Sequence, residues 1–222
     1  MNSVRTLLIA TLVLAAPRLA VTGTAQQDAA AIIGRSARVY RSLSSLAANF
    51  VQVIDNPMID SAESRGTLVQ SGRAKLAMRF SDPPSEAVII DGQHVWLYTP
   101  STTPGQVIRM RVPSGGPMYG FNLLAWFLDR PAERYKASYV RADRVGNQRV
   151  DVVRLEPTVP DMPFTTAILW LARGDGLPRR LEIEERSGAT RTLTLSAVHI
   201  NRMVPAKTFH FAVPPGVRVI EQ

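Results

Sequence analysis

The strongest constraint on the fold is a series of short segments in which apolar and polar residues alternate. The first runs from Leu46 to Ile54, where every second residue shares one face of an expected strand. Further strand-like segments are 66–70, 75–80, 87–91, 94–99, 106–112, 135–145, 149–156, 165–172, 179–185 and 190–200. Pairs such as Asp91-Gly92 separate them as tight turns. Because most of these strands are joined directly by turns, the sequence predicts a mainly β protein with one large, curved antiparallel sheet.

Two segments break this pattern and are expected to be helices. Residues 28–43 carry apolar side chains at three- and four-residue spacing, with Asp28 as the expected N-cap. Residues 119–129 (YGFNLLAWFLD) are apolar almost all the way round, so a helix there must be covered on most sides. Together the two helices could cover the concave face of the sheet and enclose an apolar space that suits an acyl chain. The alternative is that the second helix simply fills a well-packed core.

The N-terminal segment 1–25 has the features of a secretory signal peptide. Arg5 precedes an apolar run over 7–17, and the small residues Gly23-Thr24-Ala25 follow. The apolar run is too short to cross the roughly 30 Å of hydrocarbon in a bilayer. We therefore expect cleavage after Ala25 and a single, exported, soluble domain over 26–222, a buried first helix being the alternative.

Composition excludes several classes of protein. Hydrophobic residues make up 45% of the 222 residues, which excludes intrinsic disorder. The absence of Cys excludes disulfides, thiolate catalysis and a lipid anchor on an N-terminal Cys. The net charge of +8 comes from Arg residues scattered over the helix and the strands, without the basic run or aromatic platform that a nucleic-acid partner would need.

Sequence motifs for catalysis and metal binding are missing. None of His94, His199 and His210 has a His or carboxylate at the close spacing of a metal site, and no strand is followed by a nucleophile elbow or a phosphate-binding loop. We expect no enzymatic activity, no catalytic residue, no metal and no cofactor. A secreted hydrolase on an all-β scaffold is the competing interpretation.

Five motifs in order resemble the LolA family of periplasmic outer-membrane lipoprotein carriers, over nearly all of 26–222. They are Phe50-Val51-Gln52, Gly66-Thr67-Leu68, Arg79-Phe80 followed by Asp82-Pro83-Pro84, the D-G-x-x-x-W-x-Y-x-P pattern of 91–100, and the F-x-F ending at 209–217. The resemblance implies an unclosed (half) antiparallel β-barrel with an α-helical lid over a hydrophobic cavity.

The resemblance also implies a function. A non-catalytic carrier of this kind accepts acylated lipoproteins from an inner-membrane ABC transporter (LolCDE-like) in the periplasm, shields their acyl chains, and delivers them to an outer-membrane receptor (LolB-like). It would act as a monomer, without a cofactor and without nucleic acid. A periplasmic carrier of another lipid or glycolipid with the same fold is the alternative function.

The candidate site has two parts. The side chains expected to line the cavity are Phe50, Leu68, Phe80, Trp96, Tyr98, Phe121, Leu124, Trp126, Phe127, Ile168 and Trp170. The family carries an Arg-Pro pair whose Arg holds the lid closed, and Arg73-Ala74 is the nearest match here. Arg73 is therefore the candidate lid latch, and Arg79 is the competing candidate.

Overall fold

The computed structural model describes residues 22–112, 121–160 and 162–222, without the side chains of 22–28 and 59. Most of the predicted signal peptide, 1–21, lies outside the described residues. Helix α1 (Thr22–Ser42) begins six residues before Asp28. The prediction that Asp28 is the N-cap is therefore wrong, and the predicted cleavage after Ala25 falls in the first turn of α1.

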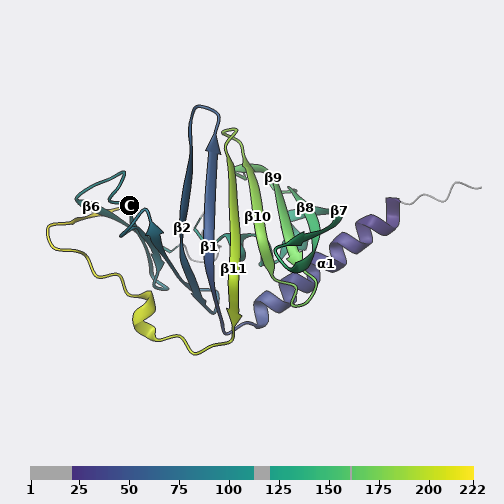
Figure 1. The fold of residues 1–222 in the computed structure, drawn as a ribbon, viewed down its shortest axis with the longest axis horizontal. Helices are drawn as coiled ribbons and strands as arrows, with labels where there is room; N and C mark the ends of the chain where they lie inside the picture. Colours follow the sequence, from purple (N-terminus) through teal and green to yellow (C-terminus); the bar gives the residue numbers. More distant parts are fainter. Residues whose placement is uncertain (1–21, 113–120, 161) are drawn as a thin grey trace, which may run out of the picture.

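The described chain forms a 12-stranded sheet in the order β12-β6-β5-β4-β3-β2-β1-β11-β10-β9-β8-β7. The strands are β1 (Ser45–Asn56), β2 (Ile59–Ser71), β3 (Lys75–Asp82), β4 (Ala87–Ile90), β5 (His94–Tyr98), β6 (Gln106–Arg111), β7 (Tyr135–Val145), β8 (Gln148–Pro157), β9 (Phe164–Ala172), β10 (Pro178–Glu185), β11 (Thr190–Ile200) and β12 (Arg218–Glu221). Neighbours are antiparallel except β12, which lies parallel to β6. The sheet keeps two free edges, β7 and β12, so it is an unclosed, curved sheet (Figure 1). This confirms the predicted fold class.

Three short helical elements complete the described fold. They are α2 (Leu123–Leu128), α3 (Pro131–Arg134) and the 3-10 helix η1 (Ala206–Phe209). Helix α1 packs against β7 and also contacts α2 and α3. In Figure 1 it runs beside the end of the sheet formed by β7, β8 and β9. Its polar side is fixed by Arg35, which donates a hydrogen bond to the carbonyl oxygen of Arg173 at 2.8 Å.

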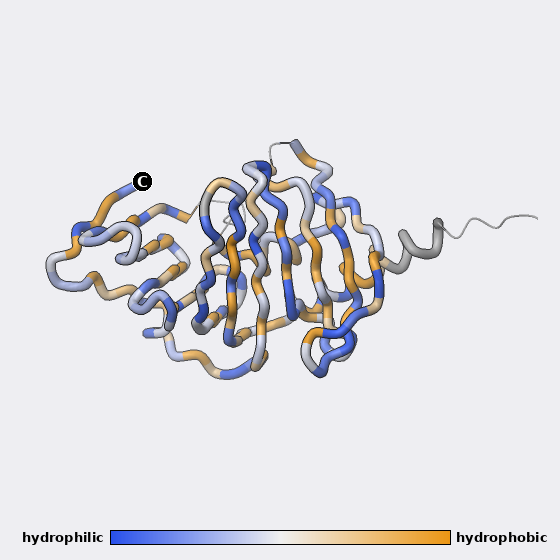
Figure 2. The backbone as a smooth tube through the Cα atoms, turned by 45° about the horizontal axis from the view of Figure 1, so that its top comes forward, coloured by the Kyte–Doolittle hydropathy of each residue, from blue (hydrophilic) through white to orange (hydrophobic). Residues whose placement is uncertain are grey.

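The hydrophobic core is divided by the sheet into an inner and an outer side. On β3, Leu76 and Met78 belong to the main core cluster, while Ala77 between them belongs to a second cluster. Successive side chains of a strand point to opposite faces, so the two clusters lie on the two faces of the sheet. We call the face toward α1 and α2 the inner face. Figure 2 shows the underlying alternation of hydrophobic and hydrophilic residues along the strands.

Candidate functional site

Helix α2 packs on the inner face of the sheet, together with α1. It is shorter than the predicted 119–129 because Asn122 caps it, its Oδ1 accepting a hydrogen bond from the backbone N–H of Ala125 at 3.0 Å, and because Asp129 is already extended. Residues 119 and 120 lie outside the described residues. All six side chains of α2 are buried. The sheet and α1 pack against α2, as its apolar composition requires.

A cluster of aromatic rings fixes α2 against β7 and β9. The ring of Phe164 lies edge-on to Trp126 and Phe127, with centroid distances of 5.1 and 5.5 Å. The hydroxyl of Tyr135 donates a buried hydrogen bond to the carbonyl oxygen of Trp126 at 3.0 Å. Edge-to-face pairs of this kind contribute about 0.5 to 1.5 kcal/mol each beyond the area they bury.

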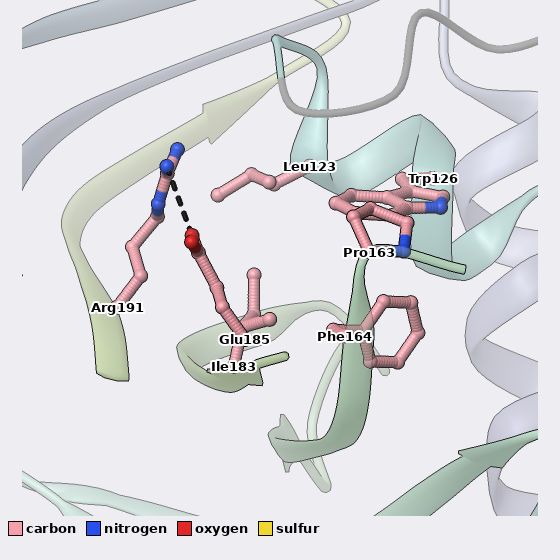
Figure 3. A pocket seen from close by; sticks show the side chains of 7 residues that line it. All are labelled: Leu123, Trp126, Pro163, Phe164, Ile183, Glu185 and Arg191. Carbon is pink, nitrogen blue, oxygen red and sulfur yellow. Dashed lines mark hydrogen bonds and ion pairs between the residues drawn. The ribbon is translucent and has the colours of Figure 1, made fainter. Parts of the chain in front are cut away.

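Two cavities lined by described residues lie between α2 and the inner face. One of about 260 Å³ lies beside Leu123 and Trp126 (Figure 3). Its lining is Leu123, Trp126, Pro163, Phe164, Ile183, Glu185 and Arg191. The other, of about 20 Å³, lies between α2 and strands β1, β2, β3 and β11. Both are smaller than the roughly 300 to 1,000 Å³ of sites that enclose a drug-sized ligand. The burial of all six α2 side chains shows that α2 is packed against the sheet.

Seven of the predicted cavity residues come together in the inner core. Phe50, Leu68, Leu124, Trp126 and Phe127 are buried in it, and Phe80 and Phe121 pack against it partly buried. Within this group the rings of Phe50 and Phe80 make an edge-on contact at 5.1 Å.

Trp96 and Tyr98 do not join this group. They pack in the second cluster, where the ring of Phe211 lies 5.6 Å from each of theirs. Val95, which precedes Trp96 on β5, points to the inner face instead. The two aromatic residues share one face as expected, but it is the outer face, where the C-terminal segment covers them.

Ile168 and Trp170 also lie on the outer face. They belong to a third cluster with Val150 and Val152, while Leu169 and Leu171 point inward. Arg180 covers Trp170, with its guanidinium carbon 4.7 Å from the ring centroid. The placement of these two residues in the cavity is therefore a wrong prediction.

The two candidate latch residues lie on different sides of the sheet. Arg73, in the turn after β2, has its Nη1 3.4 Å from Oδ1 of Asp129, the residue that ends α2. Arg79 donates hydrogen bonds instead to the carbonyl oxygens of Thr208 and His210, at 3.4 and 3.2 Å. The structure thus places Arg73 beside the C-terminal end of α2, and Arg79 against the C-terminal segment.

A buried polar cluster joins α1, β2 and the start of α2. Gln70 donates a hydrogen bond from Nε2 to the Tyr40 hydroxyl at 2.6 Å, and Tyr40 has a further side-chain hydrogen bond with Asn122. Burial raises the pKa of Tyr40 to about 12, despite the opposing effect of these hydrogen bonds. The cluster therefore consists of neutral groups at physiological pH.

Several residues of the site were not predicted. Phe164 and Tyr135 supply the rings around α2, and Ile183 and Arg191 line the larger cavity. The alternation along β10 would have found Ile183. The position of Phe164 depends on the meeting of β9 with α2, which no local pattern marks.

The described residues do not suggest a metal centre or a membrane span. Among them, no three His, Asp or Glu side chains gather closely enough to hold a metal ion. The helices described in 22–112, 121–160 and 162–222 include none long and apolar enough to cross a membrane.

Comparison with known proteins agrees with this architecture. An uncharacterized conserved protein from Thermus thermophilus superposes with a TM-score of 0.56 at 12% identity, covering 88% of this chain and 100% of that chain. A chain of the Pseudomonas aeruginosa MucA/MucB complex gives a TM-score of 0.50 at 15% identity, covering 87% and 63%. At these identities the likeness concerns the fold alone.

Sequence relatives are more informative. An outer-membrane lipoprotein carrier protein of Pseudomonas paraeruginosa is 26% identical over 230 residues, covering 100% of both chains. One of Bordetella avium is 29% identical over 214 residues, covering 93% of this chain and 91% of that protein. The family profile described as outer membrane lipoprotein carrier protein LolA matches residues 41–212. This chain therefore belongs to the LolA family of outer membrane lipoprotein carrier proteins.

Proposed function

We propose that this chain carries lipoproteins through the periplasm with their acyl chains held between α2 and the inner face of the sheet. Carriers of this family are not enzymes, so the task is one of binding and release. The burial of all six α2 side chains is the observation that carries the proposal. A helix that is apolar on every side can cover an empty apolar sheet, and it can equally cover acyl chains lying on that sheet.

The cost of exposing acyl chains to water favours their binding in place of α2 on the sheet. Each methylene group of an acyl chain costs about 0.8 kcal/mol to expose to water, so a lipoprotein needs continuous shielding between membranes. The inner face offers a continuous apolar surface from α1 to β11. Because α2 is packed into that surface, loading requires α2 to move outward.

Transfer from the inner to the outer membrane can follow from differences in binding affinity, without a chemical step in the carrier. The chain would accept cargo from an inner-membrane ABC transporter (LolCDE-like) and give it to an outer-membrane receptor (LolB-like) that binds the acyl chains more tightly. We propose that the chain is exported by the signal peptide at 1–25, that 26–222 acts as a single monomeric domain, and that no cofactor takes part.

We propose that Arg73 is the lid latch. Its ion pair with Asp129 ties the end of α2 to the turn after β2. At the start of α2, Asn122 is hydrogen-bonded to Tyr40, which in turn is hydrogen-bonded to Gln70 of β2. These two polar connections would stabilise the closed lid at its two ends while its apolar face exchanges between sheet and cargo.

The absence of Cys from the chain gives a direct test of lid movement. Ala125 is a buried residue of α2, with 6% of its surface exposed. A single Ala125→Cys variant should react slowly with a maleimide in the unloaded protein. It should react much faster after addition of a tripalmitoyl-cysteinyl lipopeptide, because α2 then moves away from the sheet.

The matched control is Ala77→Cys, also buried but under the C-terminal segment on the outer face. Its reactivity should stay low with and without lipopeptide. Equal reactivity of the Ala125→Cys thiol in both states would contradict the proposal. A response to phospholipid or glycolipid but not to lipopeptide would support the alternative cargo.

A further inference from the structure

The apolar inner face ends in a charged pair that the lipid-shielding function does not by itself explain. On β11, Leu195 lies opposite Phe50 of β1, and Leu193 lies opposite Leu181 of β10. All four side chains belong to the inner core, so Leu193 and Leu195 point inward. Arg191, two residues before Leu193, shares their face and lies opposite Ile183. Its Nη2 is 3.1 Å from Oε1 of Glu185. The inner face therefore changes from apolar to charged toward the β10–β11 turn.

This charged pair forms one wall of the larger cavity. Figure 3 shows Arg191 and Glu185 on one side, Trp126 and Phe164 on the other, and Leu123 pointing from α2 toward the pair. The cavity of about 260 Å³ is thus amphipathic, with aromatic rings at one end and a guanidinium at the other. A ligand that fits both ends has an alkyl chain attached to a polar head.

The guanidinium keeps donors for such a head. An Arg has five N–H donors, and the pair with Glu185 uses Nη2. Nε of Arg191 is enclosed, but the side chain as a whole is 27% exposed, so the Nη1 and Nη2 donors are the ones that a ligand in the cavity can reach. The acceptors that an acylated cysteine offers are the carbonyl oxygens of its ester and amide bonds, which are neutral and can enter a cavity of this kind at low desolvation cost.

We propose that Arg191, held by Glu185, is the head-group site of the carrier. It binds the ester or amide carbonyl oxygens of an acylated ligand at the turn end of β10 and β11, and this sets the direction in which the chains enter. The alkyl chains then run from Arg191 past Leu123 and Trp126 under α2. The inference rests on the proposed carrier function and adds the orientation of its cargo.

The test compares two probes on the purified protein. One is a tripalmitoyl-cysteinyl lipopeptide, which carries carbonyl acceptors. The other is diphenylhexatriene, a hydrocarbon without a hydrogen-bonding atom. In an Arg191→Met variant we expect the dissociation constant for the lipopeptide to rise about tenfold, which corresponds to about 1.4 kcal/mol for a lost charged hydrogen bond. Binding of diphenylhexatriene should not change.

A second variant and a control keep the result interpretable. Glu185→Gln combined with Arg191→Met removes both charges together, so no carboxylate is left unpaired, and it should show the same selective loss. The matched control is Arg180→Met. Arg180 is likewise paired with a Glu, Glu182 at 2.9 Å, but lies on the outer face over Trp170. It should bind both probes like the unmodified protein.

The outcomes separate this inference from the carrier proposal. An unchanged lipopeptide affinity in both Arg191 variants, or an equal loss for both probes, would overturn the head-group site while leaving the carrier function intact. If the unmodified protein bound the hydrocarbon but not the lipopeptide, the proposed function itself would fail.

Discussion

Nη1 of Arg73 lies 3.4 Å from Oδ1 of Asp129, which joins the turn after β2 to the C-terminal end of α2. The side chain of Arg73 is 59% exposed and that of Asp129 18% exposed. Exposed pairs contribute about 0.2 to 1 kcal/mol. A contribution of this size is small for the stability of the fold, but it is sufficient to shift an opening equilibrium of the lid severalfold.

Replacement of this latch should affect release more than folding. In Arg73→Leu the closed lid is less favoured, so the protein should load lipopeptide normally and transfer it to outer-membrane vesicles up to about fivefold more slowly. Its free energy of unfolding should fall by less than about 1 kcal/mol. Arg65→Leu, which removes exposed pairs with Glu63 and Asp82, is the control. Normal transfer by Arg73→Leu would remove Arg73 from the role.

The buried Tyr40 predicts a stability change at alkaline pH. Its pKa is raised to about 12 in the folded protein, above the usual value of 10. The folded state therefore holds this proton more tightly. The corresponding stabilisation, on the order of 2 to 3 kcal/mol, is fully present below pH 10 and is lost as the pH rises to about 12.

Urea denaturation between pH 9 and pH 12 measures this effect. Tyr40→Phe should be less stable than the unmodified protein at pH 8, because the polar groups of Gln70 and Asn122 lose a partner. The difference between the two proteins should shrink as Tyr40 ionises. Parallel pH profiles would show that Tyr40 does not titrate in this way.

The packing of α2 can be tested at Phe127, which is fully buried and contacts the rings of Trp126, Tyr135 and Phe164. Phe127→Ala should lower the free energy of unfolding by about 3 to 5 kcal/mol. Val213→Ala, at an exposed position, should change it by less than about 0.5 kcal/mol. A loss below about 1 kcal/mol for Phe127→Ala would mean that α2 is only loosely packed on the sheet.

The close approach of β2 and β3 makes Gly66 hard to replace. A Cβ at this position would lie 2.1 Å from the carbonyl oxygen of Arg79 and 2.8 Å from Cα of Phe80. Since both contacts are with backbone, Gly66→Ala should cost at least about 2 kcal/mol of folding free energy. Gly174→Ala, where a Cβ meets nothing within 4 Å, is the matched control. Equal melting temperatures of the two variants would contradict this expectation.

The sheet could be predicted because each strand carries its own local pattern. Alternating residues identify β3 or β9 without knowledge of the neighbours, and turn pairs such as Asp91-Gly92 separate them. The four-residue β12 was missed because its pairing with β6 depends on contacts between segments about a hundred residues apart.

The choice of face could not be predicted from the same pattern. On β5 both faces are apolar, and the aromatic residues Trp96 and Tyr98 point outward because Phe209 and Phe211 of the C-terminal segment cover them. Alternation shows which residues share a face. Only the packing of distant segments decides which face lines the cavity. The inward or outward direction of Trp170 could not be predicted for the same reason, since Arg180 covers its ring on the outer face.

Release of lipoproteins from spheroplasts would show whether this chain carries them on the inner face of its sheet. The purified protein is added to spheroplasts, and the soluble fraction is examined by immunoblot and mass spectrometry. We expect soluble complexes of the carrier with triacylated lipoproteins. Release of phospholipid or glycolipid without any lipoprotein would mean that the chain carries another lipid.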